Sequence, residues 1–149
     1  MRLESLEEVL RFAIRKEADA AAFYRMMASR SNPGLKETFE ELAREEDGHQ
    51  KRLMSFDLKN LEKVEIKEMR GLGLSEMMEE IPFSHETNYA ELLRMAIKNE
   101  ERSQKLYLNS EKLVSDPQLK RFLLVLAQEE SSHKERLEKI YEDEVLKEF

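Results

Sequence analysis

The chain contains two related octapeptides, Leu42-Ala43-Arg44-Glu45-Glu46-Asp47-Gly48-His49 and Leu126-Ala127-Gln128-Glu129-Glu130-Ser131-Ser132-His133. Each starts with an apolar pair and ends in a Glu-x-x-His motif, and the second follows the first at an offset of 84 residues (133 − 49). Apolar residues extend from both motifs at alternating steps of four and three, the spacing of a helix face turned toward a bundle core. We therefore expect both motifs inside long helices whose apolar seams they interrupt.

The repeat extends to the segments that precede each motif. At an offset of 83 residues (100 − 17), Glu17 corresponds to Glu100 and Tyr24 corresponds to Tyr107. Two helical hairpins, each with one apolar face, bury those faces best against one another. The sequence thus predicts an all-α protein, a four-helix bundle made of two repeated hairpins that fold as a single domain over residues 1–149.

Capping residues mark where the helices begin. Ser5-x-x-Glu8 reads as a capping box, while Asn32-Pro33 and Asp116-Pro117 each combine a capping side chain with a proline at the first helical position. The expected helices cover residues 5–29, 33–54, 88–114 and 117–144. The connection over residues 55–86 is too long for a tight turn, so we expect it to cross the length of the bundle, with a short helix at 75–80.

Composition narrows the classes of function. Of the 149 residues 38% are charged, only 4 are Gly and 3 are Pro, which favours a few long helices. The formal net charge is −7, and Lys and Arg are interleaved with Glu, so we expect no nucleic-acid partner. The absence of cysteine excludes disulfides, thiolate metal sites, iron–sulfur clusters and cysteine nucleophiles.

No segment predicts membrane insertion. Residues 1–4 lack the apolar core of a signal peptide, and the longest apolar run, Phe122–Ala127, is too short to span a bilayer. We therefore expect a soluble, cytoplasmic protein. Residues 122–126 are apolar all around their helix, more than one bundle face can cover, and this pattern predicts a symmetric homodimer.

Polar residues interrupt all four apolar seams at one height. They are Glu17, Glu46, His49, Glu100, Glu130 and His133. Burying carboxylates without compensation is unfavourable by several kcal/mol, whereas two divalent cations balance four of them and each imidazole adds a neutral nitrogen ligand. The pattern therefore predicts a site for two metal ions. Iron is the expected metal, and manganese and zinc stay open because their ligand preferences overlap.

Other polar and aromatic residues have less specific interpretations. Tyr24 and Tyr107 lie two turns beyond Glu17 and Glu100 on the same faces, so they either hydrogen-bond a carboxylate of the site or pack in the core. His85 has no partner at ligand spacing and is left without a role. A metal-free bundle is the alternative to the metal site, and it requires six polar residues to occupy equivalent seam positions independently.

The chain resembles the ferritin-like di-iron carboxylate proteins and is most similar to the rubrerythrin group. The resemblance rests on Glu17 with Tyr24, Glu46-x-x-His49, Glu100 with Tyr107 and Glu130-x-x-His133, spread over nearly all of the four expected helices. It implies a di-iron centre that reacts with peroxide or dioxygen. It also implies that Glu46 and Glu130 bridge the ions, and that Glu17 and Glu100 are terminal ligands.

The sequence departs from the rubrerythrin pattern in two respects. Rubrerythrins usually place an additional glutamate one turn after the ligand on the third helix, where this chain has Ser103. Full-length members also carry a rubredoxin-like domain built on four cysteines, and this sequence has none. If the site turns over, we expect its electrons to come from a separate donor protein. The alternatives are an iron-handling protein that stores or exchanges metal without turnover and an inert structural bundle.

Overall fold

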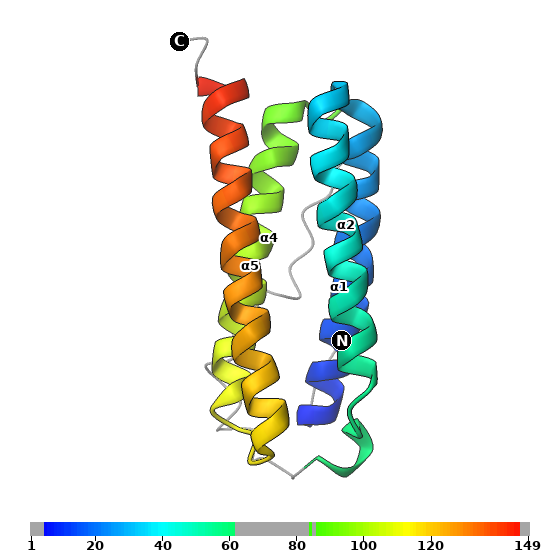
Figure 1. Ribbon diagram of the computed structural model, residues 1–149, viewed down its shortest axis with the longest axis vertical. Helices are drawn as coiled ribbons and strands as arrows, with labels where there is room; N and C mark the ends of the chain where they lie inside the picture. The colour runs from blue at the N-terminus through cyan, green and yellow to red at the C-terminus, as the bar shows by residue number, and fades with distance from the viewer. Residues whose placement is uncertain (1–4, 62–83, 85, 147–149) are drawn as a thin grey trace. The chain divides into compact units, whose positions relative to one another are not determined.

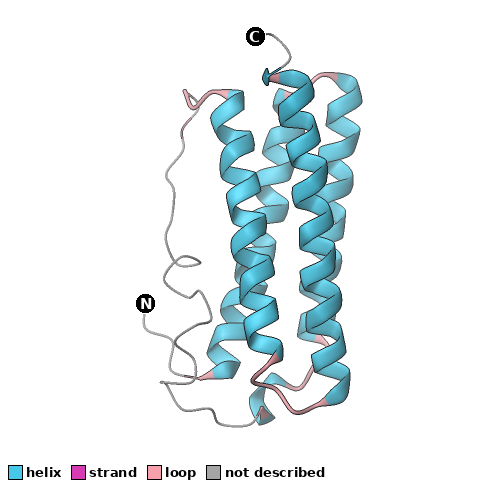
Figure 2. Cartoon of the chain, turned by 90° about the vertical axis from the view of Figure 1, so that its left-hand side faces the viewer, coloured by secondary structure: helices cyan, strands magenta, loops and turns pink. Residues whose placement is uncertain are grey.

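The computed structural model describes residues 5–61, 84 and 86–146, and the regular structure of those residues is helical (Figure 2). The long helices are α1 (Leu6–Arg30), α2 (Pro33–Met54), α4 (Tyr89–Glu111) and α5 (Pro117–Glu144). A short 3-10 helix, η1 (Leu58–Asn60), follows α2. The predicted all-α class is confirmed. Most of the predicted crossover, with the short helix expected at 75–80, and also His85 lie outside the described residues.

Each long helix begins after a side chain that accepts a hydrogen bond from a backbone N–H of the first turn. These capping residues are Ser5, Asn32, Asn88 and Asp116. Pro33 and Pro117 hold the first positions of α2 and α5, where the missing N–H leaves no helical hydrogen bond unmade. The same local chemistry therefore starts the second helix of each hairpin.

Helix α4 ends at Glu111, whereas the sequence predicted an end at residue 114. The Leu113 N–H donates to the Ser110 carbonyl at 3.0 Å, which makes a turn tighter than an α-helix. Lys120 then caps this end, because its Nζ donates to the carbonyls of Glu111 (3.0 Å) and Val114 (3.2 Å). The predicted range was therefore too long, and the side chain that caps this end comes from another helix, which the local pattern does not reveal.

In the first hairpin, α1 and α2 lie side by side and run in opposite directions (Figure 1). Its fully buried side chains include Leu10, Met27, Leu42 and Leu53. The ring of Tyr24 stacks on Phe39 with centroids 6.2 Å apart and an angle of 22° between the planes. Burying one such large apolar side chain contributes roughly 1.5–3 kcal/mol, so this seam holds the two helices together.

In the second hairpin, α4 and α5 also lie side by side. Its fully buried side chains include Leu93, Leu106, Leu123 and Leu137. At its edge, Lys134 Nζ lies 2.9 Å from Glu101 Oε1. In the apolar run over residues 122–126, Leu124 and Val125 are 46% and 37% exposed while the other three side chains are buried. The homodimer that this run predicted stays a prediction.

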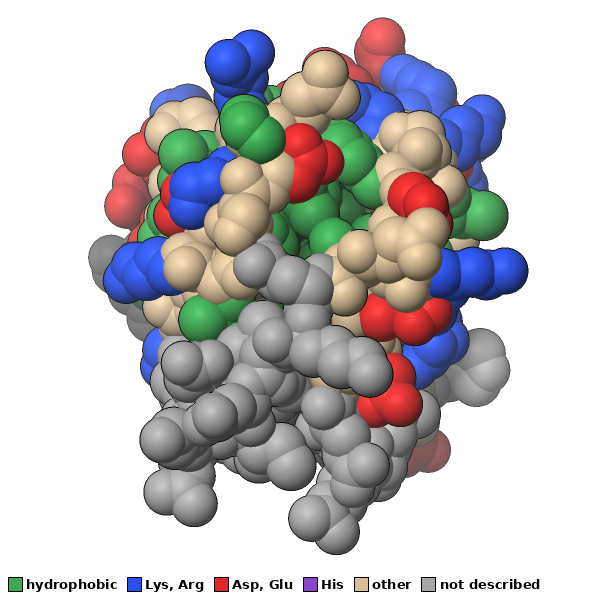
Figure 3. Space-filling model, turned by 90° about the horizontal axis from the view of Figure 1, so that it is seen from below, with side chains coloured by type: hydrophobic (Ala, Val, Ile, Leu, Met, Phe, Trp, Pro, Cys, Tyr) green, Lys and Arg blue, Asp and Glu red, His purple; other side chains and the backbone are tan. Residues whose placement is uncertain are grey.

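Long-range contacts group the helices into two compact units, with one hairpin in each. The single domain expected over residues 1–149 stays a prediction. Among the described residues, no helix is long and apolar enough to cross a membrane. Both acidic and basic side chains are exposed among the described residues in Figure 3. Each unit carries its own set of ionisable core residues, and these define the candidate site.

Candidate metal-binding site

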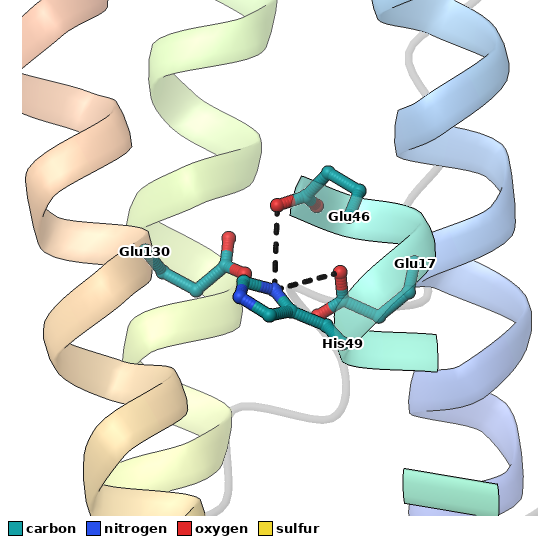
Figure 4. Close-up of side chains that lie close together, drawn as sticks. All are labelled: Glu17, Glu46, His49 and Glu130. Carbon is teal, nitrogen blue, oxygen red and sulfur yellow. Dashed lines mark ion pairs between the residues drawn. The ribbon is translucent and has the colours of Figure 1, made fainter. Parts of the chain in front are cut away.

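The first hairpin carries three ionisable side chains in its core. Glu17 comes from α1, whereas Glu46 and His49 come from α2, one turn apart on the same face. Their exposed fractions are 2%, 2% and 4%. His49 Nδ1 lies 3.4 Å from Glu17 Oε2 and 3.5 Å from Glu46 Oε1 (Figure 4). We call these three residues the first half-site.

The second hairpin repeats this arrangement with residues of the same types. Glu100 comes from α4, and Glu130 and His133 come from α5, again one turn apart. Their exposed fractions are 3%, 1% and 2%. His133 Nδ1 lies 3.5 Å from Glu100 Oε1. We call these three residues the second half-site, and its imidazole-to-carboxylate distance nearly equals that of the first.

The spacing of the donor atoms within each half-site fits a metal ion. Each of the three residues offers one ligand atom, and these atoms lie within 4.8 Å of one another. Metal bonds to nitrogen and oxygen of about 2.0–2.2 Å place neighbouring ligand atoms roughly 3–4 Å apart. Only small side-chain adjustments therefore separate either half-site from a coordination geometry.

Electrostatics also favour a cation at each half-site. Two carboxylates buried together without a neighbouring positive charge are energetically unfavourable, because burial removes them from water. A protonated imidazole supplies one positive charge, while a divalent ion supplies the two that match two carboxylates. In both half-sites Nδ1 lies within 3.5 Å of a site carboxylate oxygen, so Nδ1 is the nitrogen placed to bind an ion.

The donor atoms limit which metals fit. Both half-sites offer carboxylate oxygens and one imidazole nitrogen, and the sequence contains no cysteine. Such donors suit iron and manganese and also accept zinc, whereas metals that require thiolate ligands are excluded. The six predicted site residues are thus brought together as two sets of three, and their role as metal ligands stays a prediction.

The two tyrosines named with the site are buried, at 2% exposed for Tyr24 and 0% for Tyr107. The stacked contact of Tyr24 with Phe39 supports a packing role for its ring. A hydrogen bond from either hydroxyl to a site carboxylate stays a prediction. Ser103 is half-buried one turn after Glu100, and Ala20 holds the corresponding place after Glu17. Both half-sites therefore lack a further carboxylate at that position.

Arg102 is a buried charged residue that the sequence patterns did not single out. It is 7% exposed and follows Glu100 by two residues on α4. It lies off the heptad seam, on a flank of α4 that also buries Leu106 and Ser110. The only sequence feature that could indicate its burial is its position one turn before Leu106. On an amphipathic helix this position does not distinguish a buried arginine from a solvated one.

Comparisons with known proteins agree with this geometry. The rubrerythrin family model matches residues 8–80 and 91–148 of this chain. A Thermotoga maritima protein described as ferritin-like and diiron-carboxylate is similar in structure, with 20% identity and a TM-score of 0.74 over 95% of this chain and 97% of that chain. A hypothetical protein from Pyrococcus furiosus is 31% identical, with a TM-score of 0.70 over 93% of this chain and 89% of that chain. No curated protein matches significantly. The ferritin-like fold expected from the sequence is confirmed.

Proposed function

Because the chain belongs to the rubrerythrin family, we propose that its two half-sites together hold two iron ions and that the protein reduces peroxide or dioxygen there. The observation that carries this proposal is the matched pair of buried Glu–Glu–His half-sites, one in each hairpin. Four carboxylates balance the charge of two divalent ions, and each imidazole adds one nitrogen ligand.

The residues of the two half-sites have distinct proposed roles. Glu46 and Glu130 would hold both ions, while Glu17 and Glu100 would each bind one. A bound ferrous pair supplies two electrons, which peroxide takes up with two protons to give two water molecules. The apolar side chains that surround each half-site exclude water and strengthen the interaction of the carboxylates with positive charge. We propose that a separate donor protein returns two electrons per peroxide; this sequence has no cysteine to hold a thiolate-bound redox centre.

Iron handling without turnover is the second candidate function. Ser103 favours it, because the second half-site lacks the further carboxylate that rubrerythrins usually place one turn after the third-helix ligand. A protein of this kind oxidises ferrous iron once and then stores or transfers the ferric product. The two candidates share the ligands and differ in whether the reduced state is regenerated.

Metal content and peroxide kinetics test both candidates. Protein purified from its native host should contain about two ions per chain by elemental analysis, and fewer than about one contradicts a dinuclear function. The diferrous protein should be oxidised when mixed with peroxide and should repeat the cycle in excess reductant. A single oxidation that added reductant does not reverse supports iron handling instead.

A matched pair of variants on α5 tests the ligands. Glu130→Gln keeps the shape of a buried ligand and removes its charge, so we expect loss of bound iron and a fall in peroxide reduction of at least about 100-fold. Glu135→Gln makes the same change at an exposed position of the same helix and should retain both properties. Equal behaviour of the two variants contradicts the proposed site.

A further inference from the structure

The second hairpin exposes two leucines that lie within about one helical turn of the same height. Leu108 on α4 is 39% exposed and Leu124 on α5 is 46% exposed. Glu101 contacts Lys134 across the hairpin, which sets the register of the two antiparallel helices. Leu108 lies seven residues after Glu101 on α4, and Ala127 lies seven residues before Lys134 on α5. Because the two helices are antiparallel, Leu108 and Ala127 lie at the same height. Leu124 is one turn from Ala127, which places it beside Leu108.

Three exposed cations surround these leucines. Lys105 and Lys112 lie one turn before and after Leu108, and Arg121 lies one turn before Leu124. We call these five residues the leucine surface. The acidic Glu111 nearby is already 3.2 Å from Lys120 Nζ. The leucine surface therefore contains three cationic side chains on a chain whose formal net charge is −7.

The internal repeat copies the core but not this surface. The positions of the first hairpin that correspond to the leucine surface hold Ala22, Arg25, Ser29, Glu37 and Glu40. Glu37 and Glu40 replace Arg121 and Leu124, so both the apolar pair and the positive charge are absent there. Because the first hairpin folds without them, packing within a hairpin does not require the features of the leucine surface.

A second copy of the chain is poorly matched to the leucine surface. A symmetric dimer places the same patch against itself. Lys105 lies on one side of the leucines along the helices, and Lys112 and Arg121 lie on the other side. A two-fold axis through the leucines therefore brings cations of one copy against cations of the other, which is unfavourable. An acidic protein surface with a small apolar centre matches the patch in both charge and polarity.

We propose that the leucine surface docks the acidic protein that delivers electrons to the metal site. The proposal rests on the proposed function, which requires an external one-electron donor to act twice for each peroxide. Leu124 precedes Glu130 by six residues and Leu108 follows Glu100 by eight, which are about 9 and 12 Å along a helix. Electron-transfer encounters use small interfaces with electrostatic steering, and this patch has both properties.

The test measures electron delivery by a protein donor and by a small reductant in parallel. The protein probe is a reduced rubredoxin of net negative charge, and the small reductant is dithionite, which needs no docking surface. Lys112→Glu with Arg121→Glu reverses the charge of the leucine surface, and Leu124→Ser removes its apolar centre. The matched control is Lys36→Glu with Lys51→Glu, two exposed lysines of α2 that give the same change in net charge.

We expect charge reversal to raise the KM for rubredoxin at least about tenfold and to abolish its dependence on ionic strength. Leu124→Ser should raise the same KM, and the rate with dithionite should stay unchanged in all variants. A control double variant that is impaired as much as the charge reversal overturns the proposal. So does a dimer, detected by sedimentation without rubredoxin, that Leu124→Ser dissociates.

Calorimetric titration with rubredoxin separates failure of docking from failure of the proposed function, since it requires no turnover. Saturable binding that charge reversal abolishes supports the docking surface even if the wild-type protein fails to reduce peroxide with dithionite. Peroxide reduction with dithionite but no saturable binding of rubredoxin overturns the docking surface and leaves the proposed function in place.

Discussion

Gly48 stands inside α2 directly before His49, at a position where helix propensity favours alanine and packing leaves room for it. A methyl group at its Cβ position would meet no other atom within 4 Å. Glycine inside a helix is about 0.5–1 kcal/mol less favourable than alanine, because the unfolded chain has more conformational freedom to lose. The corresponding residue of the second hairpin is Ser132, so the repeat does not require glycine at this position.

We expect Gly48→Ala to raise the free energy of unfolding by about 0.5–1 kcal/mol, measured by urea denaturation of the metal-free protein. Gly34→Ala is the matched control, since its Cβ would make an ordinary contact of 3.6 Å with Asn32 Oδ1 in the first turn of the same helix. Alanine stabilises a helix less in the first turn than in the interior, so Gly34→Ala should raise the free energy of unfolding by less than Gly48→Ala. A loss of stability in Gly48→Ala contradicts the open space described around it.

At the scale of single helices, the end of α4 is capped by a side chain of α5. Lys120 of α5 caps the end of α4 through two carbonyls, with its Nζ also 3.2 Å from Glu111 Oε1. Hydrogen bonds from a charged donor are worth more than neutral ones, and the last carbonyls of a helix need such donors. The turn between α4 and α5 therefore depends on a side chain that follows it in the sequence.

We expect Lys120→Met to lower the free energy of unfolding by about 1–2 kcal/mol, because the aliphatic stem is kept while the donor is lost. The internal repeat offers a control in Lys36→Met, since Lys36 is exposed at the corresponding position of α2. Urea denaturation of both variants measures the difference. Equal losses in the two variants contradict a specific capping role for Lys120.

The ion pair between α4 and α5 gives the second hairpin a pH dependence. The hydrogen bond from Lys134 to Glu101 raises the pKa of Lys134 above its usual 10.5, with Glu138 and Glu135 adding to the effect. A raised pKa in the folded state stabilises the fold below pH 10.5 and loses that contribution as the pH rises through the folded value. Because Glu101 is exposed and Lys134 is partly exposed, solvent screens the pair and the contribution is small, roughly a few tenths of a kcal/mol.

Comparison of the wild-type protein with Lys134→Met tests this sign. The difference in unfolding free energy should be constant between about pH 7 and 9 and should shrink above the usual pKa of lysine. Urea denaturation across this range measures it. A difference that grows with rising pH contradicts the stated direction.

At the scale of the whole molecule, metal binding and folding should be coupled. The six ionisable residues of the half-sites are at most 4% exposed, so removing the ions leaves buried carboxylates near one another. A ligand that binds only the folded state stabilises it by about 2.7 kcal/mol when present at 100 times its Kd. For a chain of this size that energy raises Tm by roughly 5–10 °C per ion.

We therefore expect ferrous iron to raise the Tm of the apoprotein under anaerobic conditions and a chelator to reverse the rise. Differential scanning calorimetry with stepwise addition of iron measures the effect. The rise should be smaller in Glu130→Gln and unchanged in Glu135→Gln, whose side chain is exposed. A Tm that does not respond to iron contradicts metal binding at the half-sites.

How much of the site was predictable depends on how local its signal is. Glu46 and His49 stand one turn apart on one helix, so periodicity alone placed them together, and the repeat did the same for Glu130 and His133. Glu17 and Glu100 needed a second helix to reach these pairs, and the repeat supplied that correspondence. Arg102 was missed because burial on the flank of a helix depends on neighbouring elements.

The sequence by itself predicted the four helices, the capped beginnings of three of them, the repeat of the two hairpins and the six residues of the half-sites. These features follow from local backbone chemistry and from periodicity, which act over one or two turns. Only the tertiary structure decided that Lys120 ends α4 at Glu111, and that Leu124 is exposed within an apolar run whose neighbours are buried. Those outcomes depend on which side chains an adjacent helix presents, and such contacts join residues that are distant along the chain.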